Sequence, residues 1–141
     1  RKICDSIWAI YASKSYVQQY GRPASIADLT GHAMIGFEGI MQNHRVAKWL
    51  PVAVPNARVV NRNNSMLGTL SAVKVGIGVA PLPTTLGDAE ETLVQVLPPV
   101  EELTRSWYLL SHPDLRKTPR IAAFVDHVLD DIPALRKALI G

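Results

Sequence analysis

Short apolar segments typical of buried strands alternate along this chain with segments that have the caps and spacing of helices. The expected strands cover residues 7–12, 33–37, 57–61, 77–80, 93–97 and 107–111, and helices are expected at 13–21, 25–31, 65–75 and 83–89. This alternation predicts an α/β domain with a mixed, largely parallel sheet covered by helices on both faces. In such sheets, small ligands bind beyond the carboxyl ends of the strands, where helices begin.

Capping residues and glycines set most of the expected boundaries. Ser13 is placed to cap the first helix and Gly21 to end it, and Ser25 to Asp28 has the form of a capping box. Asn64 or Ser65 is expected to cap a helix whose apolar face carries Met66, Leu67, Leu70 and Val73, and Gly76 is expected to stop it. Pro81 and Pro83 are expected to end the strand over 77–80.

Two further segments have a different character. Residues 38–56 are polar and broken by Gly and Pro, which predicts a loop with a short hairpin around Trp49. Thr118 and Pro119 have the form of an N-cap and first helical residue, followed by Ile121, Phe124, Val125, Val128, Leu129 and Ile132 at helical spacing. Pro133 is expected to end or kink that helix.

Composition restricts the class of protein. The chain has 141 residues, 48% of them hydrophobic and 19% charged, as in a folded domain rather than a disordered tail. Its longest near-apolar stretch, 76–83, is far shorter than the roughly 20 residues of a membrane span. The net charge of +3 is spread along the chain without the basic stripe of a nucleic-acid groove. Its first residues have neither Met nor the apolar run of a signal peptide, which suggests a piece of a longer protein.

The turn from Asn61 to Ser65 is the most informative candidate site. A helix beginning there points free backbone N–H groups and its positive dipole end beyond the strands, with the Ser65 hydroxyl, the Asn side chains and Arg62 as further donors. This arrangement suits a carboxylate or another small anion. The alternative is an ordinary helix cap.

Other chemistry has little support in the pattern. Gly76 and Gly78 follow a helix and precede a strand, the reverse of a dinucleotide-binding loop. The four histidines, His32, His44, His112 and His127, have no metal-ligand spacing, and His32 and His112 are expected to face solvent or to cap backbone. No nucleophile elbow or acid/base pair stands out, so no catalytic residue, metal or cofactor is predicted.

The single cysteine, Cys4, excludes an internal disulfide and fits a reducing cytoplasm. Trp8, Trp49 and Trp107 are candidate core anchors, although Trp49 is equally suited to covering a cleft.

The order of several segments resembles the effector-binding domain of LysR-type transcriptional regulators. The segments are Tyr11 to Tyr16, Tyr20 to Leu29, His32 to Phe37, Asn63 to Leu67, Ala72 to Pro83 and Trp107 to Arg120. They span nearly the whole chain, and their order is more specific than any one of them. The resemblance implies a fold like type 2 periplasmic-binding proteins. One full lobe is expected at 12–106, and 1–11 and 107–141 are expected to form the hinge strands and part of a second lobe whose first half this chain lacks.

The resemblance also implies a function. An effector would bind between the lobes and alter DNA binding by a helix-turn-helix domain that this chain lacks. Carried over by position, the effector-binding residues are Gly36, Phe37, Glu38, Asn63, Asn64, Ser65, Pro81, Leu82 and Pro83.

We therefore expect a non-enzymatic sensor domain of a bacterial, cytoplasmic regulator that binds a small anionic molecule and has no membrane partner. The alternatives are a lobe of a periplasmic solute-binding protein and an enzyme of similar bilobal fold. The apolar face with Ile121, Phe124, Val128 and Ile132 predicts self-association as a dimer or domain-swapped pair.

Overall fold

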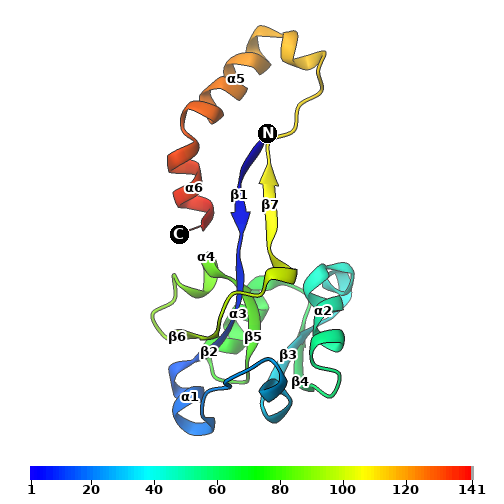
Figure 1. Ribbon diagram of the computed structural model, residues 1–141, viewed down its shortest axis with the longest axis vertical. Helices are drawn as coiled ribbons and strands as arrows, with labels where there is room; N and C mark the ends of the chain where they lie inside the picture. The colour runs from blue at the N-terminus through cyan, green and yellow to red at the C-terminus, as the bar shows by residue number, and fades with distance from the viewer. Residues whose placement is uncertain (141) are drawn as a thin grey trace. The chain divides into compact units, whose positions relative to one another are not determined.

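The computed structural model describes residues 1–140, which form two compact units (Figure 1). The central unit comprises Ile7–Thr104, and the terminal unit comprises Arg1–Ser6 with the chain from Arg105 onward. The predicted assignment of 12–106 to one lobe and of the remaining residues to another stays a prediction. No helix in the described part of the chain is long and apolar enough to span a membrane.

The strands are β1 (Lys2–Ser6), β2 (Trp8–Ser13), β3 (Ala33–Phe37), β4 (Arg58–Asn63), β5 (Ala80–Pro83), β6 (Leu93–Leu97) and β7 (Arg105–Tyr108). The α-helices are α1 (Lys14–Tyr20), α2 (Arg45–Ala53), α3 (Met66–Lys74), α4 (Thr84–Gly87), α5 (Pro119–Asp130) and α6 (Ile132–Ile140). Short 3₁₀ helices are η1 (Ala27–Gly31), η2 (Gly39–Asn43), η3 (Glu101–Leu103) and η4 (Leu115–Lys117).

The central unit is built on one mixed sheet. β2 pairs antiparallel with β5 and with β6, and β3 pairs parallel with β4. A parallel bridge between Met34 and Val79 joins β3 to the chain that enters β5, which gives the order β4–β3–β5–β2–β6. Only β2 runs against the other strands of this unit, so the predicted mixed, largely parallel sheet is confirmed.

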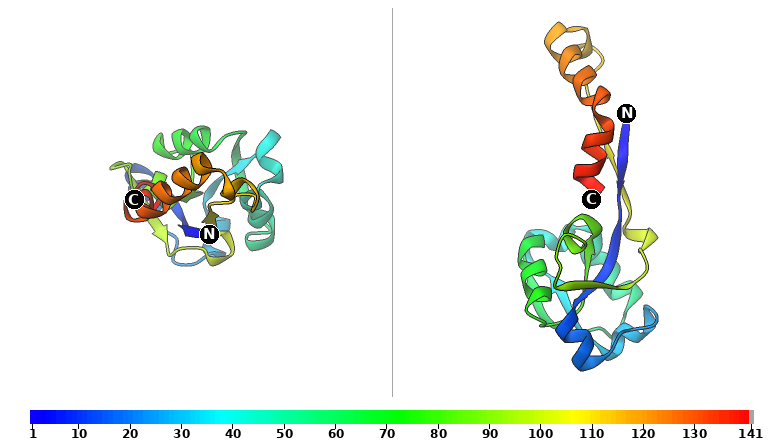
Figure 2. Two further views of the ribbon diagram at one scale, coloured as in Figure 1. Left: turned by 90° about the horizontal axis from the view of Figure 1, so that it is seen from above. Right: turned by 90° about the vertical axis from the view of Figure 1, so that its left-hand side faces the viewer.

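Helices cover both faces of this sheet, as predicted. Side chains of β2 alternate between two cores, with Trp8, Ile10 and Ala12 in one and Ala9 and Tyr11 in the other. The first core is closed by buried residues of α2 and η1, and the second by those of α3. The right-hand view of Figure 2 shows α3 (green) on one side of β2 and η1 (blue) on the other.

The predicted caps act locally as expected. The Ser13 Oγ accepts a hydrogen bond from the Tyr16 amide (3.1 Å), and the Ser65 Oγ accepts one from the Gly68 amide (3.1 Å). Gly76 follows α3 with a φ of 79°, a conformation that glycine adopts without strain. Pro119 begins α5, and Pro133 lies in the first turn of α6, just after α5 ends.

The loop and hairpin predicted for 38–56 are wrong, because this segment contains η2 and the nine-residue helix α2. Trp49 and Leu50 lie one helical turn after Val46, so that the three side chains share one face of α2 and are buried. Their burial outweighs the presence of Pro51, whose missing N–H removes one helical hydrogen bond. Trp8 is buried like Trp49, whereas Trp107 in the terminal unit is 51% exposed and is not a core anchor.

The fourth predicted strand is displaced to Ala80–Pro83, so that Pro81 lies inside β5 and only Pro83 ends it. Val79 donates to the Ala33 carbonyl on the β3 side, while the Thr84 amide donates to the Ile7 carbonyl on the β2 side. Backbone N–H groups alternate in direction along a strand, so Pro81 and Pro83 lack donors only on the β3 side. The pairing of β5 with β2 is therefore kept.

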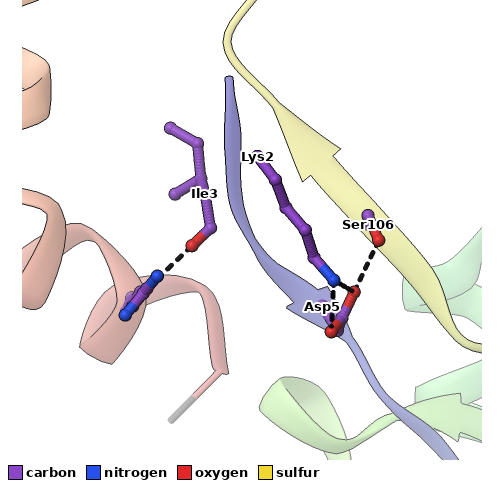
Figure 3. A network of polar contacts seen from close by, with 5 residues as sticks. Lys2, Ile3, Asp5 and Ser106 are labelled. Carbon is purple, nitrogen blue, oxygen red and sulfur yellow. Dashed lines mark hydrogen bonds and ion pairs between the residues drawn. The ribbon is translucent and has the colours of Figure 1, made fainter.

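In the terminal unit, β1, which the pattern did not predict, pairs antiparallel with β7. Asp5 of β1 accepts hydrogen bonds from the Lys2 ammonium (2.9 Å) and the Ser106 hydroxyl (2.6 Å) (Figure 3). These two bonds lower the pKa of Asp5 below its ordinary value, and the bond from Lys2 has the larger effect. The Arg136 guanidinium donates to the Ile3 carbonyl (2.7 Å) and so ties α6 to β1. The predicted apolar face of the last helix is divided, because Ile132 is buried whereas Phe124 is 59% exposed.

Two smaller expectations are also corrected. The short helix predicted after Ser25 is the 3₁₀ helix η1, and only half of the capping box forms. The Ser25 Oγ accepts a hydrogen bond from the Asp28 amide (3.3 Å), but the Asp28 carboxylate accepts from the Ala24 amide (3.0 Å) rather than from the Ser25 amide. Leu67 does not join the apolar face of α3, because it lies on the exposed side, and Thr69 and Ala72 are buried with Leu70 and Val73.

Candidate functional site

The carboxyl ends of β3 and β4 lie side by side at one edge of the central sheet. Gly36 is opposite Arg62 and Phe37 is opposite Asn63 in the parallel register, and the Glu38 amide donates to the Asn63 carbonyl (2.9 Å). Two of the three predicted segments, 36–38 and 63–65, are therefore adjacent in space. Their proximity follows from the pairing of the strands.

The start of α3 supplies hydrogen-bond donors at this edge. The Ser65 Oγ accepts from the Gly68 amide, which leaves the Ser65 hydroxyl hydrogen free to donate outward. The amides of Met66 and Leu67, at the first turn of α3, point the same way and have no intrahelical acceptor. Glu38, Asn64 and Ser65 are exposed, and Asn63 is half-buried with its Nδ2 donating to the Asn61 Oδ1 (2.7 Å).

The loop after β3 approaches the turn before α3. Gly39 has a φ of 56°, and a Cβ built on it would lie 3.3 Å from the Cβ of Asn64. A larger residue at position 39 would be both strained and crowded against Asn64. Glycine at position 39 therefore allows the two loops to approach each other closely at the carboxyl edge.

The third predicted segment joins this edge only through its last residue. Pro81 and Leu82 are buried, and the Leu82 side chain lies in the core that α3 covers. Pro83 ends β5 and is half-buried. The side chain of Phe37 is also in a core. A ligand at this edge would therefore meet mainly the backbone of Gly36 and Phe37. A binding role for any of the nine predicted residues stays a prediction.

Arg62 lies beside Gly36. Its Nη1 is 3.2 Å from the point that a Cβ on Gly36 would occupy. Gly36 and Arg62 both line a cavity of about 250 Å³ between α2 and the β3–β4 pair. The sequence pattern marks Arg62 as one more donor but does not show which face of the sheet it joins.

A larger cavity of about 630 Å³ lies elsewhere in the central unit, near the end of β6. Trp49 forms part of its wall and is only 9% exposed, so this side chain is both a core residue and part of a cavity wall. Glu101 and Glu102 stand at the border of this cavity and are exposed.

The histidines have structural surroundings. His32 is buried rather than solvent-facing, with its Nδ1 3.3 Å from the Tyr16 hydroxyl, which accepts a hydrogen bond from the Ala33 amide (2.9 Å). His112 accepts a hydrogen bond from the Asp114 amide (3.3 Å), the backbone cap that was predicted. Within residues 1–140 there is no cluster of three or more His, Cys, Asp or Glu side chains that could hold a metal ion.

Comparison with solved structures supports the fold. The regulatory domain of AphB from Vibrio vulnificus, treated with cumene hydroperoxide, superposes with a TM-score of 0.72 at 22% identity, over 92% of this chain and 67% of that chain. The regulatory domain of CrgA, a LysR-type transcriptional regulator from Neisseria meningitidis, gives 0.64 at 23% identity, over 94% of this chain and 68% of that one.

Full-length AphB, the virulence activator of Vibrio cholerae, gives a TM-score of 0.65 at 21% identity and is covered over 46% of its length by 92% of this chain. The chain therefore spans less than half of that regulator. No match was found among curated protein sequences.

The family model described as the LysR substrate binding domain matches residues 1–133. This match covers nearly the whole chain, and the solved structures with the same fold are regulatory domains. The chain belongs to the LysR substrate-binding domain family.

Proposed function

We propose that this chain is the effector-sensing part of a bacterial transcription regulator and that it binds a small organic anion at the carboxyl edge of its central sheet. The observation that carries the proposal is the register of β3 and β4, which places Glu38 beside Asn63 and the start of α3. Family membership supports the regulatory role.

The donors at the edge favour an anion over a cation. The exposed Asn64 amide, the Ser65 hydroxyl and the first amides of α3 are available to donate hydrogen bonds, and the helix dipole adds positive potential at the same place. The Glu38 carboxylate, which is exposed at this edge, would oppose a second negative charge on the ligand. A singly charged molecule therefore suits the edge best.

Regulation would follow from differential affinity. An effector that binds one arrangement of the intact protein more tightly shifts its population, and by linkage the DNA complex changes effector affinity by the same factor. DNA would be bound by a helix-turn-helix domain outside this chain, in the cytoplasm. The chain would act without catalysis or a cofactor.

A thermal-shift screen of small carboxylic acids, each beside its neutral amide, tests the binding. We expect at least one acid, but not its amide, to raise the melting temperature of the chain. Asn64→Asp should abolish that rise, because it places a negative charge at the edge. Asn56→Asp, an exposed change before β4, is the matched control and should leave the rise intact.

The coding sequence upstream of Arg1 tests the regulatory role separately. A helix-turn-helix there, with transcription from a reporter that responds to the acid found in the screen, would support the proposal. A signal peptide there would point to a secreted solute-binding protein and would overturn it.

A further inference from the structure

The β4 strand carries a bulge that changes which side chains share a face. Met34 is opposite Val59, but the next residue, Ile35, is opposite Asn61, so Val60 is the extra residue. A bulge of this kind reverses the alternation after it. As a result Val59 and Arg62 both face Gly36, although they are three positions apart and regular alternation would put them on opposite faces.

Gly36 leaves open the space between these two side chains. A Cβ at this position would come within 2.9 Å of the Val59 Cγ1 and 3.2 Å of the Arg62 Nη1. The absent side chain contributes to the cavity of about 250 Å³ under α2. Its other walls are apolar and include Ala47, Leu50, Pro51, Val54 and Ala57.

Among the residues that the structure describes around this cavity, Arg62 is the only charged one, and it is exposed at the rim. No lining side chain carries a hydroxyl, amide or carboxylate group. Among residues 1–140, Arg62 forms no ion pair. A guanidinium presents a planar fork of N–H donors that matches a carboxylate with two parallel hydrogen bonds. The cavity therefore offers one site for a carboxylate and otherwise apolar surface.

We infer that the cavity under α2 is the specificity pocket of this domain and that it takes a small monocarboxylate with a compact branched or cyclic aliphatic body, held by Arg62. This inference rests on the proposed function and names the ligand class for it. The carboxylate would meet Arg62 at the carboxyl edge, next to the donors of α3, and the apolar body would lie between α2 and Gly36.

Size and charge exclude other anions. A volume of about 250 Å³ is below the roughly 300–1,000 Å³ of ordinary ligand pockets, which favours a ligand with a short body. Inorganic phosphate has no apolar body to bury between α2 and Gly36, and the exposed Glu38 at the same edge would oppose its second negative charge. A sugar acid would bury hydroxyl groups where no side chain can satisfy them.

The test is calorimetric titration of the 141-residue chain with 3-methylbutanoate, its neutral amide and inorganic phosphate. We expect only 3-methylbutanoate to bind. Arg62→Gln should weaken its affinity by about ten- to a hundredfold, the usual effect of losing a paired charge-assisted hydrogen bond. Arg62→Lys, which keeps the charge but not the fork, should weaken it less.

Two further variants control for charge and for shape. Arg58→Gln removes the same charge from an exposed position on the same strand, outside the cavity, and should change the affinity less than twofold. Ala47→Leu fills the cavity from α2 and should weaken binding while leaving Arg62 in place. Urea unfolding of each variant verifies that it is folded.

The outcomes separate this inference from the proposed function. Equal effects of Arg62→Gln and Arg58→Gln, or equal affinity for the amide, would overturn the pocket assignment. Failure of 3-methylbutanoate, with another acid binding in an Asn64-dependent way, would overturn the inference and leave the proposed function standing. Absence of binding by any acid would count against both.

Discussion

Tyr11 and Gly87 are in such close contact that any side chain on Gly87 would overlap the ring of Tyr11. Tyr11 is a central residue of β2, and Gly87 ends α4, so the glycine lets the helix pack directly on the ring. The Tyr11 hydroxyl donates to the Asp88 carboxylate (2.6 Å) just beyond it. This contact fixes α4 against the sheet.

Gly87→Ala should therefore destabilise the chain by about 1–3 kcal/mol, because the ring of Tyr11 or the backbone of α4 must move. Urea unfolding measures the loss. Gly31→Ala is the matched control, since a Cβ there would meet no atom within 4 Å. Equal stability of the two variants would contradict the packing argument.

The environment of Tyr11 also leads us to expect that the stability of the chain falls at high pH. Burial, and then the hydrogen bond to Asp88, raise the pKa of Tyr11 above its ordinary value of 10.0. The unfolded chain releases this proton first, so the stabilising contribution is complete below about pH 10 and is lost as the pH rises from there toward the folded pKa. Asp88→Asn should reduce the difference between the Tyr11 pKa in the folded and unfolded chain, and the free energy of unfolding should then fall less steeply with pH. Urea unfolding from pH 8 to about pH 11, with tyrosinate absorbance, would show it; an unchanged slope in the variant would refute the role of Asp88.

Tyr16→Phe should cost about 1–3 kcal/mol, because it leaves the Ala33 amide and His32 without the buried hydroxyl that they share. Chemical unfolding is the measurement. Tyr20→Phe removes a hydroxyl from a tyrosine that is 58% exposed and should be neutral. If both changes were neutral, another group would have to satisfy the Ala33 amide.

Ser65→Ala should destabilise the chain by about 1 kcal/mol through loss of the α3 cap. Ser71→Ala, at an exposed position within the same helix, should be neutral or slightly stabilising. Thermal unfolding of the pair distinguishes a cap from a general effect of serine. A loss of the same size in both variants would be evidence against the cap.

Self-association predicted from the last helix is tested at Phe124. Its exposed ring on α5 lies in the terminal unit, whose other exposed apolar residues include Trp107, Tyr108 and Leu110. Phe124→Glu should lower the mass measured by light scattering at high concentration. Ile40→Glu, at a residue 84% exposed in the central unit, should not. A monomeric parent chain would contradict the prediction.

Within the site, the strand register explains why two of the three predicted segments lie next to each other and why the third segment mostly does not join them. Segments 36–38 and 63–65 meet because parallel neighbours end at one edge. Pro81 and Leu82 were predicted for the same edge, but β5 continues through them, and the Leu82 side chain is buried in the core under α3. The sequence carries no signal that β5 extends through Pro81 and Leu82, because the extent of this strand depends on its hydrogen bonds with β2.

The sequence by itself determined the features that depend on bonds between near neighbours. Ser13 and Ser65 cap helices by accepting hydrogen bonds from amides three residues away, and Gly76 takes a conformation that other residues avoid. The unbroken apolar run of β2 marks a strand buried on both faces. Tertiary structure decided the features that depend on what lies opposite. Burial against the sheet made α2 a helix despite Pro51, and the bulge in β4 turned Arg62 toward Gly36. Local hydrogen bonds are encoded within a few residues, whereas burial and register are set by partners far away in the chain.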